Sequence, residues 1–280
     1  MVTSSNSGAG MHVNVAGTGQ PALVFVHGFA CDSTDWAAQL DSLGSRTEVV
    51  SCDLGSHGRS PGEEPEASIA AYGASVARLL EELGLTAVIL VGHSMGCRVV
   101  LECARRASER VVGIVLLDGS RIGVGDPTAA ARTMAARLEG AGYASFLREF
   151  FAAMFVPSSE PRLQRAVLER ALRLPPNVGR RLLVDIVQWD AGEMEAALSR
   201  VSVPLLTIQT TTLNVEGDRV SLAADSESAW LDLVRGHQPD VEIATLTGAG
   251  HFPHIENAEK VTELIGNFLD RVAATAPGSS

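Results

Sequence analysis

Short apolar runs rich in β-branched residues alternate along this chain with segments of helical periodicity. The runs are PALVFVHG (21–28), EVVSCD (48–53), TAVILVGH (86–93), VVGIVLLD (111–118), VPLLTIQ (203–209) and VEIATL (241–246). Helical spacing of apolar residues is found between and after them, at 34–43, 66–83, 95–107, 226–236 and 256–273. Strands that are apolar throughout are covered on both faces, which is typical of parallel sheets. The alternation therefore predicts an α/β fold with a mostly parallel, doubly wound sheet.

The segment 121–200 interrupts this alternation. It has no convincing strand pattern, and prolines divide its helical stretches, at Pro127, Pro157, Pro161, Pro175 and Pro176. A segment of this length is too long for a plain loop in a compact domain. We therefore expect a helical insertion at 121–200, within one core formed by 11–120 and 201–273. The small, polar stretches 1–10 and 274–280 are expected to be flexible termini.

Composition and charge exclude several classes of protein. The 280 residues include 22 basic and 33 acidic side chains, for a net charge of −11, and they form no basic stripe, so a nucleic-acid partner is not expected. No apolar run approaches the roughly 18 residues of a membrane helix, and MVTSSNSGAG at the N-terminus does not resemble a secretory signal. We expect a soluble, cytoplasmic protein that does not bind membranes. The sequence does not indicate its oligomeric state.

The strongest local signal is the pentapeptide GHSMG at 92–96. It follows the apolar run AVILV directly and precedes a helical segment directly. A Gly-x-Ser-x-Gly sequence at a strand-to-helix turn holds its serine in a strained, exposed conformation at the positive end of a helix. The glycines are needed because side chains there would clash with the neighbouring strand and helix. Ser94 is therefore the expected nucleophile.

A nucleophilic serine needs a base, and His251 is the candidate that we favour among seven histidines. It lies in GAGHFPHIEN, after the last predicted strand and before the last predicted helix. That position brings it to the carboxyl edge of the sheet, where Ser94 should also emerge. His254 could pair with His251, but nothing supplies further ligands at metal spacing, so we expect no metal site. No cofactor is implied either.

At this point the chain resembles the α/β-hydrolase superfamily. The matching stretches are VHGFACDSTDW (26–36), DLGSHGRS (53–60), VGHSMG (91–96), IVLLDGS (114–120) and GAGHFPHIE (248–256). The resemblance implies an α/β-hydrolase fold with a helical cap inserted after the sixth strand, where 121–200 falls. It also implies the chain order nucleophile, acid, histidine, and an oxyanion hole made by the backbone N–H groups of Phe29 and Met95.

The acid departs from the family's pattern. The family usually has Gly-x-x-Asp shortly after the strand that corresponds to 203–209, and here Asp218 matches only if several residues are inserted. Some members place the acid at the end of the sixth strand instead, which here is Asp118. Asp218 could equally be a solvated loop charge, and Asp118 could be a structural residue of its turn. Both remain candidates for orienting the histidine and stabilising its imidazolium, and Glu216, or no acid at all, is the remaining alternative.

The sequence indicates the general class of substrate. Phe146, Phe150 and Trp189 in the insertion are candidate pocket residues, although packing of the insertion on the core explains them as well. Arginines of the insertion (Arg121, Arg132, Arg137, Arg148) would suit an acyl or anionic small molecule, or simply be solvated. The triad predicts hydrolysis of an ester, thioester or activated C–C bond in a small, mostly apolar substrate. Lyase or cyclase chemistry with the same triad, and a catalytically silent ligand receptor, are the alternatives.

Overall fold

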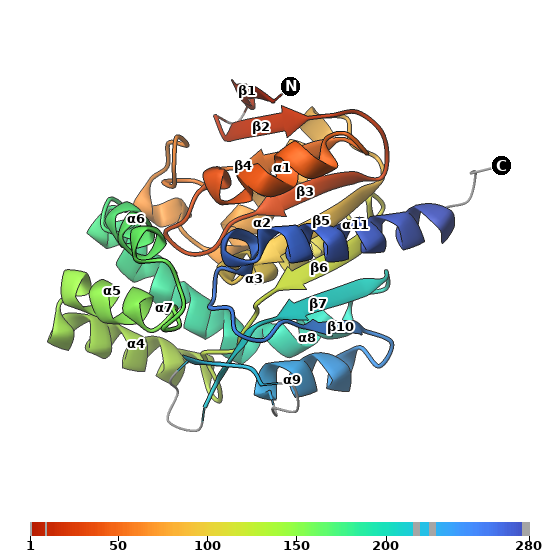
Figure 1. The fold of residues 1–280 in the computed structure, drawn as a ribbon. Coiled ribbons are helices and arrows are strands. Elements are labelled where there is room, and N and C mark those ends of the chain that lie inside the picture. Colours follow the sequence, from red (N-terminus) through yellow and green to blue (C-terminus); the bar gives the residue numbers. More distant parts are fainter. Residues whose placement is uncertain (1, 9, 215–218, 224–227, 276–280) are drawn as a thin grey trace.

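A single eight-stranded sheet runs through the centre of the molecule in the computed structural model, which describes residues 2–8, 10–214, 219–223 and 228–275 (Figure 1). The strand order is β1-β2-β4-β3-β5-β6-β7-β10. The strands are β1 (Thr3–Asn6), β2 (His12–Ala16), β3 (Ala22–Val26), β4 (Val49–Cys52), β5 (Val88–His93), β6 (Val111–Leu117), β7 (Leu205–Gln209) and β10 (Glu242–Thr245). Pairing is parallel from β4 to β10 and antiparallel at β1–β2 and β2–β4. The predicted doubly wound, mostly parallel sheet is confirmed.

Helices cover both faces of this sheet. The 3₁₀ turn η1 (Ser33–Trp36), α1 (Ala37–Leu43) and α11 (Ala258–Thr275) pack on the face in front in Figure 1. Their apolar side chains, including Leu40, Ile265 and Phe268, form one core with the strands. Behind the sheet lie α2 (Ile69–Glu82), preceded by η2 (Glu64–Glu66), and α3 (Met95–Arg106). Two-sided coverage explains why the central strands are apolar throughout.

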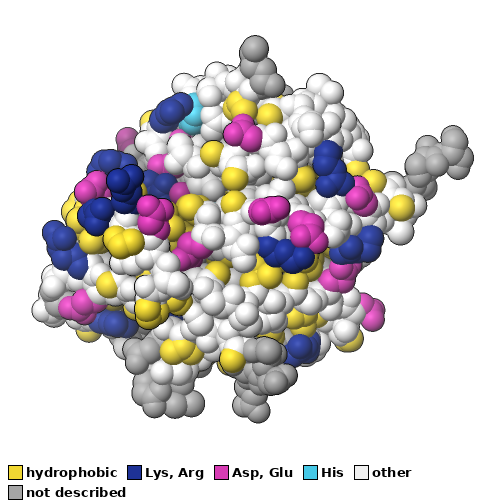
Figure 2. Space-filling view, viewed as in Figure 1, with side chains coloured by type: hydrophobic (Ala, Val, Ile, Leu, Met, Phe, Trp, Pro, Cys, Tyr) yellow, Lys and Arg dark blue, Asp and Glu magenta, His cyan; other side chains and the backbone are white. Residues whose placement is uncertain are grey.

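Between β6 and β7 the chain forms helices only. They are α4 (Pro127–Ala141), α5 (Tyr143–Ala152), α6 (Pro161–Ala171), α7 (Pro176–Gly192) and α8 (Met194–Ser199). Three of them begin at the prolines that divide the sequence pattern, because proline suits the first turn of a helix. In the view of Figure 2, basic side chains gather on the left, over this insertion, with acidic side chains among them, and they are arginines because 121–200 contains no lysine. The segment 121–200 contains eleven arginines against nine acidic residues in a chain that is acidic as a whole.

The N-terminus differs from the sequence prediction. Residues 1–10 were expected to be flexible, but β1 pairs with β2 in register from Thr3–Val15 to Asn6–His12. The pairing uses backbone hydrogen bonds while all four β1 side chains are exposed. An exposed polar strand has no apolar signature that a sequence pattern could reveal.

The last part of the chain holds smaller elements. A two-stranded hairpin of β8 (Thr211–Leu213) and β9 (Arg219–Ser221) follows β7, and α9 (Ala229–His237) and α10 (Pro253–Glu256) flank β10. The expected helix at 256–273 is α11, which extends to Thr275. Among the described residues, none of the helices is long and apolar enough to cross a lipid bilayer.

Candidate active site

Ser94 stands at the sharp turn between β5 and α3. Its backbone has φ 54° and ψ −113°, a conformation that few non-glycine residues adopt. Gly92 and Gly96 make the turn possible: a Cβ at Gly92 would lie 2.3 Å from the Gly96 carbonyl oxygen, and one at Gly96 would lie 2.4 Å from the carbonyl oxygen of Val26. The sequence therefore folds into a strained turn that leaves the Ser94 hydroxyl partly exposed at the sheet edge.

His251 and Asp118 complete a hydrogen-bonded row with Ser94. His251 Nε2 lies 2.8 Å from Ser94 Oγ, and His251 Nδ1 lies 2.6 Å from Asp118 Oδ2. An ionised carboxylate can only accept, so Nδ1 carries the ring proton and Nε2 is free to accept the serine proton. These are the distances and roles of a nucleophile, a general base and an orienting acid.

The residues that follow β7 hold the Asp118 carboxylate in place by hydrogen bonds. It follows β6 directly with φ 44°. Its Oδ1 accepts from the backbone N–H groups of Thr210 and Thr211, both at 2.8 Å, and Oδ2 accepts from the Thr211 hydroxyl at 2.6 Å. Burial alone would raise the pKa of Asp118, but its hydrogen bond to His251 and the nearby charges hold that pKa below its usual value. The carboxylate therefore stays ionised.

Of the two acid candidates, Asp118 is the one that the structure brings to His251. Asp218, the other, lies outside the described residues. Thr211, which binds Asp118, and Arg219, whose Nη1 lies 3.6 Å from Asp118 Oδ2, were not singled out from the sequence. Arg219 follows Asp218 in the Gly-Asp-Arg-Val stretch that resembles the family's acid loop, but the contacts of both residues with Asp118 depend on β7 ending beside β6.

The loop after β3 lies against the nucleophile. A Cβ at Gly28 would be 3.3 Å from Ser94 Cβ, so only glycine allows this approach without displacing a neighbour. The next residue is Phe29, and Met95 is the first residue of α3. Within the part of the chain that the structure describes, neither of their backbone N–H groups has a hydrogen-bond acceptor. Two N–H donors beside Ser94 therefore remain available to an oxyanion.

Burial makes His251 a weakly basic histidine. Its side chain is 1% exposed, and burial lowers its pKa to about 4, with a further lowering by the positive charge of Arg219. The hydrogen bond to Asp118 acts in the opposite direction. At neutral pH the imidazole is uncharged, which is the state that can accept a proton from Ser94.

Aromatic side chains of the insertion lie over the loop after β3, which carries Phe29. Phe150 is 6.2 Å from Phe29 between ring centroids and packs on Phe146, which is buried. Trp189 is also buried in the core that the sheet and insertion share. The structure thus brings Phe150 to the site, whereas Phe146 and Trp189 pack in the interior. Arg121, one of the arginines considered for an anionic substrate, pairs with Glu195 at 2.7 Å.

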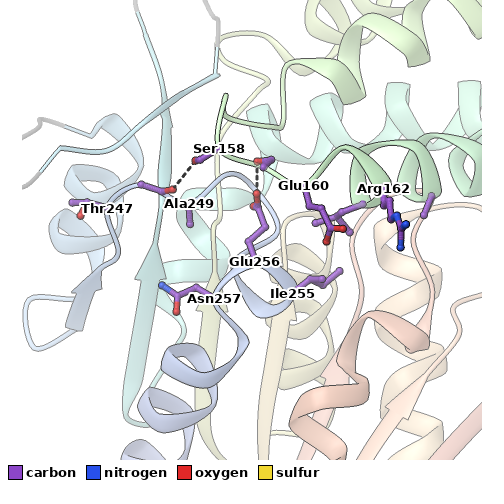
Figure 3. Close-up of a pocket in the computed structure, with 12 residues that line it drawn as sticks. Ser158, Glu160, Arg162, Thr247, Ala249, Ile255, Glu256 and Asn257 are labelled. Atoms are coloured by element: carbon purple, nitrogen blue, oxygen red, sulfur yellow. Dashed lines mark hydrogen bonds between the residues drawn. The ribbon is translucent and has the colours of Figure 1, made fainter.

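A cavity lined by both polar and apolar residues borders the loop that carries His251 (Figure 3). Its volume is about 610 Å³, and it lies between the start of α6 and the segment 247–257. Ser159 donates to the Glu256 carboxylate, and the backbone N–H of His251 donates to the Met154 carbonyl at 2.8 Å. The insertion is therefore hydrogen-bonded both to His251 itself and to Glu256, which follows in the same segment. Among the described residues, no group of three histidine, cysteine or acidic side chains could hold a metal ion.

A buried ion pair joins the insertion to the nucleophile turn. Arg98, one helical turn after Ser94, binds both oxygens of Asp190 on α7, with Nε–Oδ1 2.6 Å and Nη2–Oδ2 2.7 Å. Arg98 also donates to the carbonyl oxygens of Ser94 and Ser120, and Asp190 accepts from the Ile122 N–H. Both side chains are at most 2% exposed. The sequence offered no signal for this pair, since its members are far apart in the chain.

Five buried histidines (His27, His57, His93, His251 and His254) have pKa values that burial lowers, and they make the free energy of unfolding depend on pH. Burial lowers the pKa of His57 and His254 to about 3 and that of His251 to about 4. Below pH 6.5 the unfolded chain takes up protons at these residues while the folded chain does not. Stability is therefore full above pH 6.5 and falls as the pH drops towards 4, by up to about 1.4 kcal/mol per pH unit for each histidine.

Urea unfolding between about pH 7 and pH 5 measures this dependence. His254→Phe is the matched variant, because His254 stacks on Trp36 with centroids 4.4 Å apart and a phenyl ring keeps that contact. We expect the variant to lose about a fifth of the pH slope, because His254 is one of five buried histidines whose pKa is lowered. An unchanged slope in the variant would contradict the assignment to His254.

Comparisons with known proteins agree with this geometry. A family model described as "Alpha/beta hydrolase family" matches residues 23–264. The dihydrolipoyllysine-residue acetyltransferase component of the acetoin cleaving system is similar to this chain in Cupriavidus necator, with 37% identity over 39% of the chain and 29% of that protein. The Pseudomonas putida protein of the same name is 26% identical over 91% of the chain and 65% of its own length. The chain thus spans less than two thirds of either relative.

Other similar proteins match along nearly their whole length. A 2-hydroxy-6-oxononadienedioate/2-hydroxy-6-oxononatrienedioate hydrolase of Pseudomonas sp. is 24% identical over 96% of this chain and 95% of its own. Among solved structures, a thermophilic esterase from Thermogutta terrifontis has a TM-score of 0.76 and 24% identity, covering 97% of this chain and 99% of its own. These likenesses confirm the predicted α/β-hydrolase fold.

Proposed function

This chain belongs to the alpha/beta hydrolase family, and we propose that it is a serine hydrolase whose triad is Ser94, His251 and Asp118. The observation that carries the proposal is the continuous hydrogen-bonded row from Asp118 Oδ2 through the His251 ring to Ser94 Oγ, at 2.6 and 2.8 Å. The strained turn at Ser94 and the unpaired N–H groups beside it also support the proposal.

The proposed reaction has two halves. Ser94 Oγ attacks the substrate carbonyl carbon while its proton moves to His251 Nε2, and the N–H groups of Phe29 and Met95 bind the oxyanion. The bond to the leaving group then breaks, the leaving group takes the proton from Nε2, and an acyl-enzyme remains. In the second half His251 takes a proton from water, the hydroxide adds to the acyl carbon, and Ser94 leaves with that proton. Asp118 keeps Nδ1 protonated throughout and stabilises the transient imidazolium.

The proposed substrate is a small, mostly apolar ester, thioester or compound with an activated C–C bond. The aromatic packing of Phe150 on Phe29 supports an apolar surface beside the oxyanion loop. Similar proteins named as an esterase, an enol-lactonase and a 2-hydroxy-6-oxononadienedioate/2-hydroxy-6-oxononatrienedioate hydrolase are compatible with a hydrolytic reaction.

The test is the intact mass after incubation with a fluorophosphonate probe, together with turnover of p-nitrophenyl esters. We expect a single adduct on the native chain, no adduct on Ser94→Ala, and ester turnover by the native chain only. A labelled chain that turns over no ester would favour lyase or cyclase chemistry on the same triad. Absence of both labelling and turnover in a folded chain would contradict the proposal and favour a receptor.

A further inference from the structure

Arg219 is a buried cation beside the triad that the reaction above does not use. It is the first residue of β9, and its side chain is 8% exposed. Its Nη1 donates to Thr211 Oγ1 at 2.6 Å and lies 3.6 Å from Asp118 Oδ2. A buried guanidinium costs desolvation free energy, so an arginine here calls for an explanation in terms of its neighbours.

Those neighbours form a chain of hydrogen bonds that ends at the Asp118 carboxylate. Arg219 donates to the Thr211 oxygen, and the Thr211 hydroxyl in turn donates to Asp118 Oδ2 at 2.6 Å. The same Oδ2 accepts from His251 Nδ1. The same carboxylate oxygen therefore accepts from the hydroxyl that Arg219 orients and from the imidazole, and the guanidinium nitrogen lies 3.6 Å from that oxygen.

We propose that Arg219 is a positioning residue that acts on the triad through Asp118, orienting the carboxylate by way of Thr211 and opposing a positive charge on His251. The effect on catalysis rests on the proposed function, whereas the effect on the His251 imidazole does not. A neutral side chain at position 219 could also donate a hydrogen bond to Thr211. Only a charged side chain can in addition partly neutralise the Asp118 carboxylate.

The charged and titratable groups that face His251 give the direction of the effect. Asp118 favours the imidazolium, while Arg219 and, more weakly, Arg98 oppose it. His93, with ring centroids 4.8 Å away, and His254 are buried with lowered pKa values and are neutral. Removal of the Arg219 charge therefore raises the pKa of His251, and the imidazole becomes protonated at a higher pH.

Two neutral variants separate charge from hydrogen bonding. Arg219→Gln removes the charge and keeps a donor for Thr211, and Arg219→Met removes both. Arg219→Lys keeps the charge, and Arg271→Met removes an exposed arginine from α11 as a matched control. The first measurement is the NMR titration of the His251 imidazole, assigned with His251→Asn. The second is the pH dependence of fluorophosphonate labelling.

In the native chain we expect the imidazole to stay neutral down to about pH 5, since its pKa is about 4. In Arg219→Gln and Arg219→Met we expect the midpoint to rise by about one to three units, which a nearby charge typically causes. The low-pH limb of labelling should move by the same amount, while Arg219→Lys and Arg271→Met follow the native chain.

The outcomes decide both proposals separately. If Arg219→Met does not fold, Arg219→Gln gives the answer, because it retains the Thr211 contact. An unmoved His251 midpoint in a folded neutral variant overturns the inference and leaves Arg219 a purely structural residue. A moved midpoint without any labelling of the native chain upholds the inference and contradicts the proposed hydrolase.

Discussion

Asp118→Asn is expected to slow fluorophosphonate labelling and ester turnover by about 10⁴-fold, the loss known for the same change in a Ser-His-Asp triad. Native Asp118 accepts the Nδ1–H of His251 and so leaves Nε2 free to take the Ser94 proton. An asparagine amide can donate to Nδ1 instead, which moves the ring proton to Nε2. The imidazole would then no longer accept the serine proton. Far-UV circular dichroism and thermal unfolding establish that the variant is folded.

Asp218→Asn is the matched control, because it makes the same chemical change at the other acid candidate. We expect its labelling rate to stay within a few-fold of the native rate, because His251 Nδ1 keeps its hydrogen bond to Asp118. If Asp118→Asn were labelled at the native rate and Asp218→Asn were labelled slowly, Asp218 would be the acid. Asp118 would then be a structural residue of its turn, held by Thr210 and Thr211.

The parts of the fold that local pattern encodes could be predicted. The apolar runs at 86–93 and 111–118 became β5 and β6 because strands buried on both faces must be apolar at every position. The turn at Ser94 was equally predictable, since glycines at 92 and 96 are required by contacts within a few residues and with the adjacent strand. In contrast, β1 is polar and exposed, and the sequence left it as a flexible end.

The parts of the site that depend on strand order could not be predicted in full. Whether Asp118 or Asp218 reaches His251 depends on how the end of β7 meets the end of β6. The backbone N–H groups of Thr210 and Thr211 can bind Asp118 only because the ends of β6 and β7 lie side by side. The place of Arg219 next to Asp118 follows from the β8–β9 pairing, which joins Leu213 to Arg219. None of these contacts leaves a trace in the spacing of residue types.

Arg98→Met is expected to lower the free energy of unfolding by about 3–5 kcal/mol, the usual penalty for breaking a buried ion pair from one side. The methionine leaves the Asp190 carboxylate without a cation at 0% exposure. It also removes the donors to the carbonyl oxygens of Ser94 and Ser120. Urea unfolding monitored by circular dichroism gives the change, read at an unchanged m-value.

The double variant Arg98→Met/Asp190→Asn shows where that penalty comes from. The asparagine is neutral and keeps an oxygen that can accept from the Ile122 N–H. If an uncompensated buried charge causes the loss, the double variant should regain most of it, because two neutral side chains of similar size can replace a buried pair at little cost.

The exposed Lys260–Glu263 pair supplies a control. Lys260→Met, which breaks that pair, should change the free energy of unfolding by no more than about 1 kcal/mol. A double variant as unstable as Arg98→Met would instead assign the loss to the Ser94 and Ser120 carbonyls, and the ion pair would then matter chiefly as a support for the nucleophile turn.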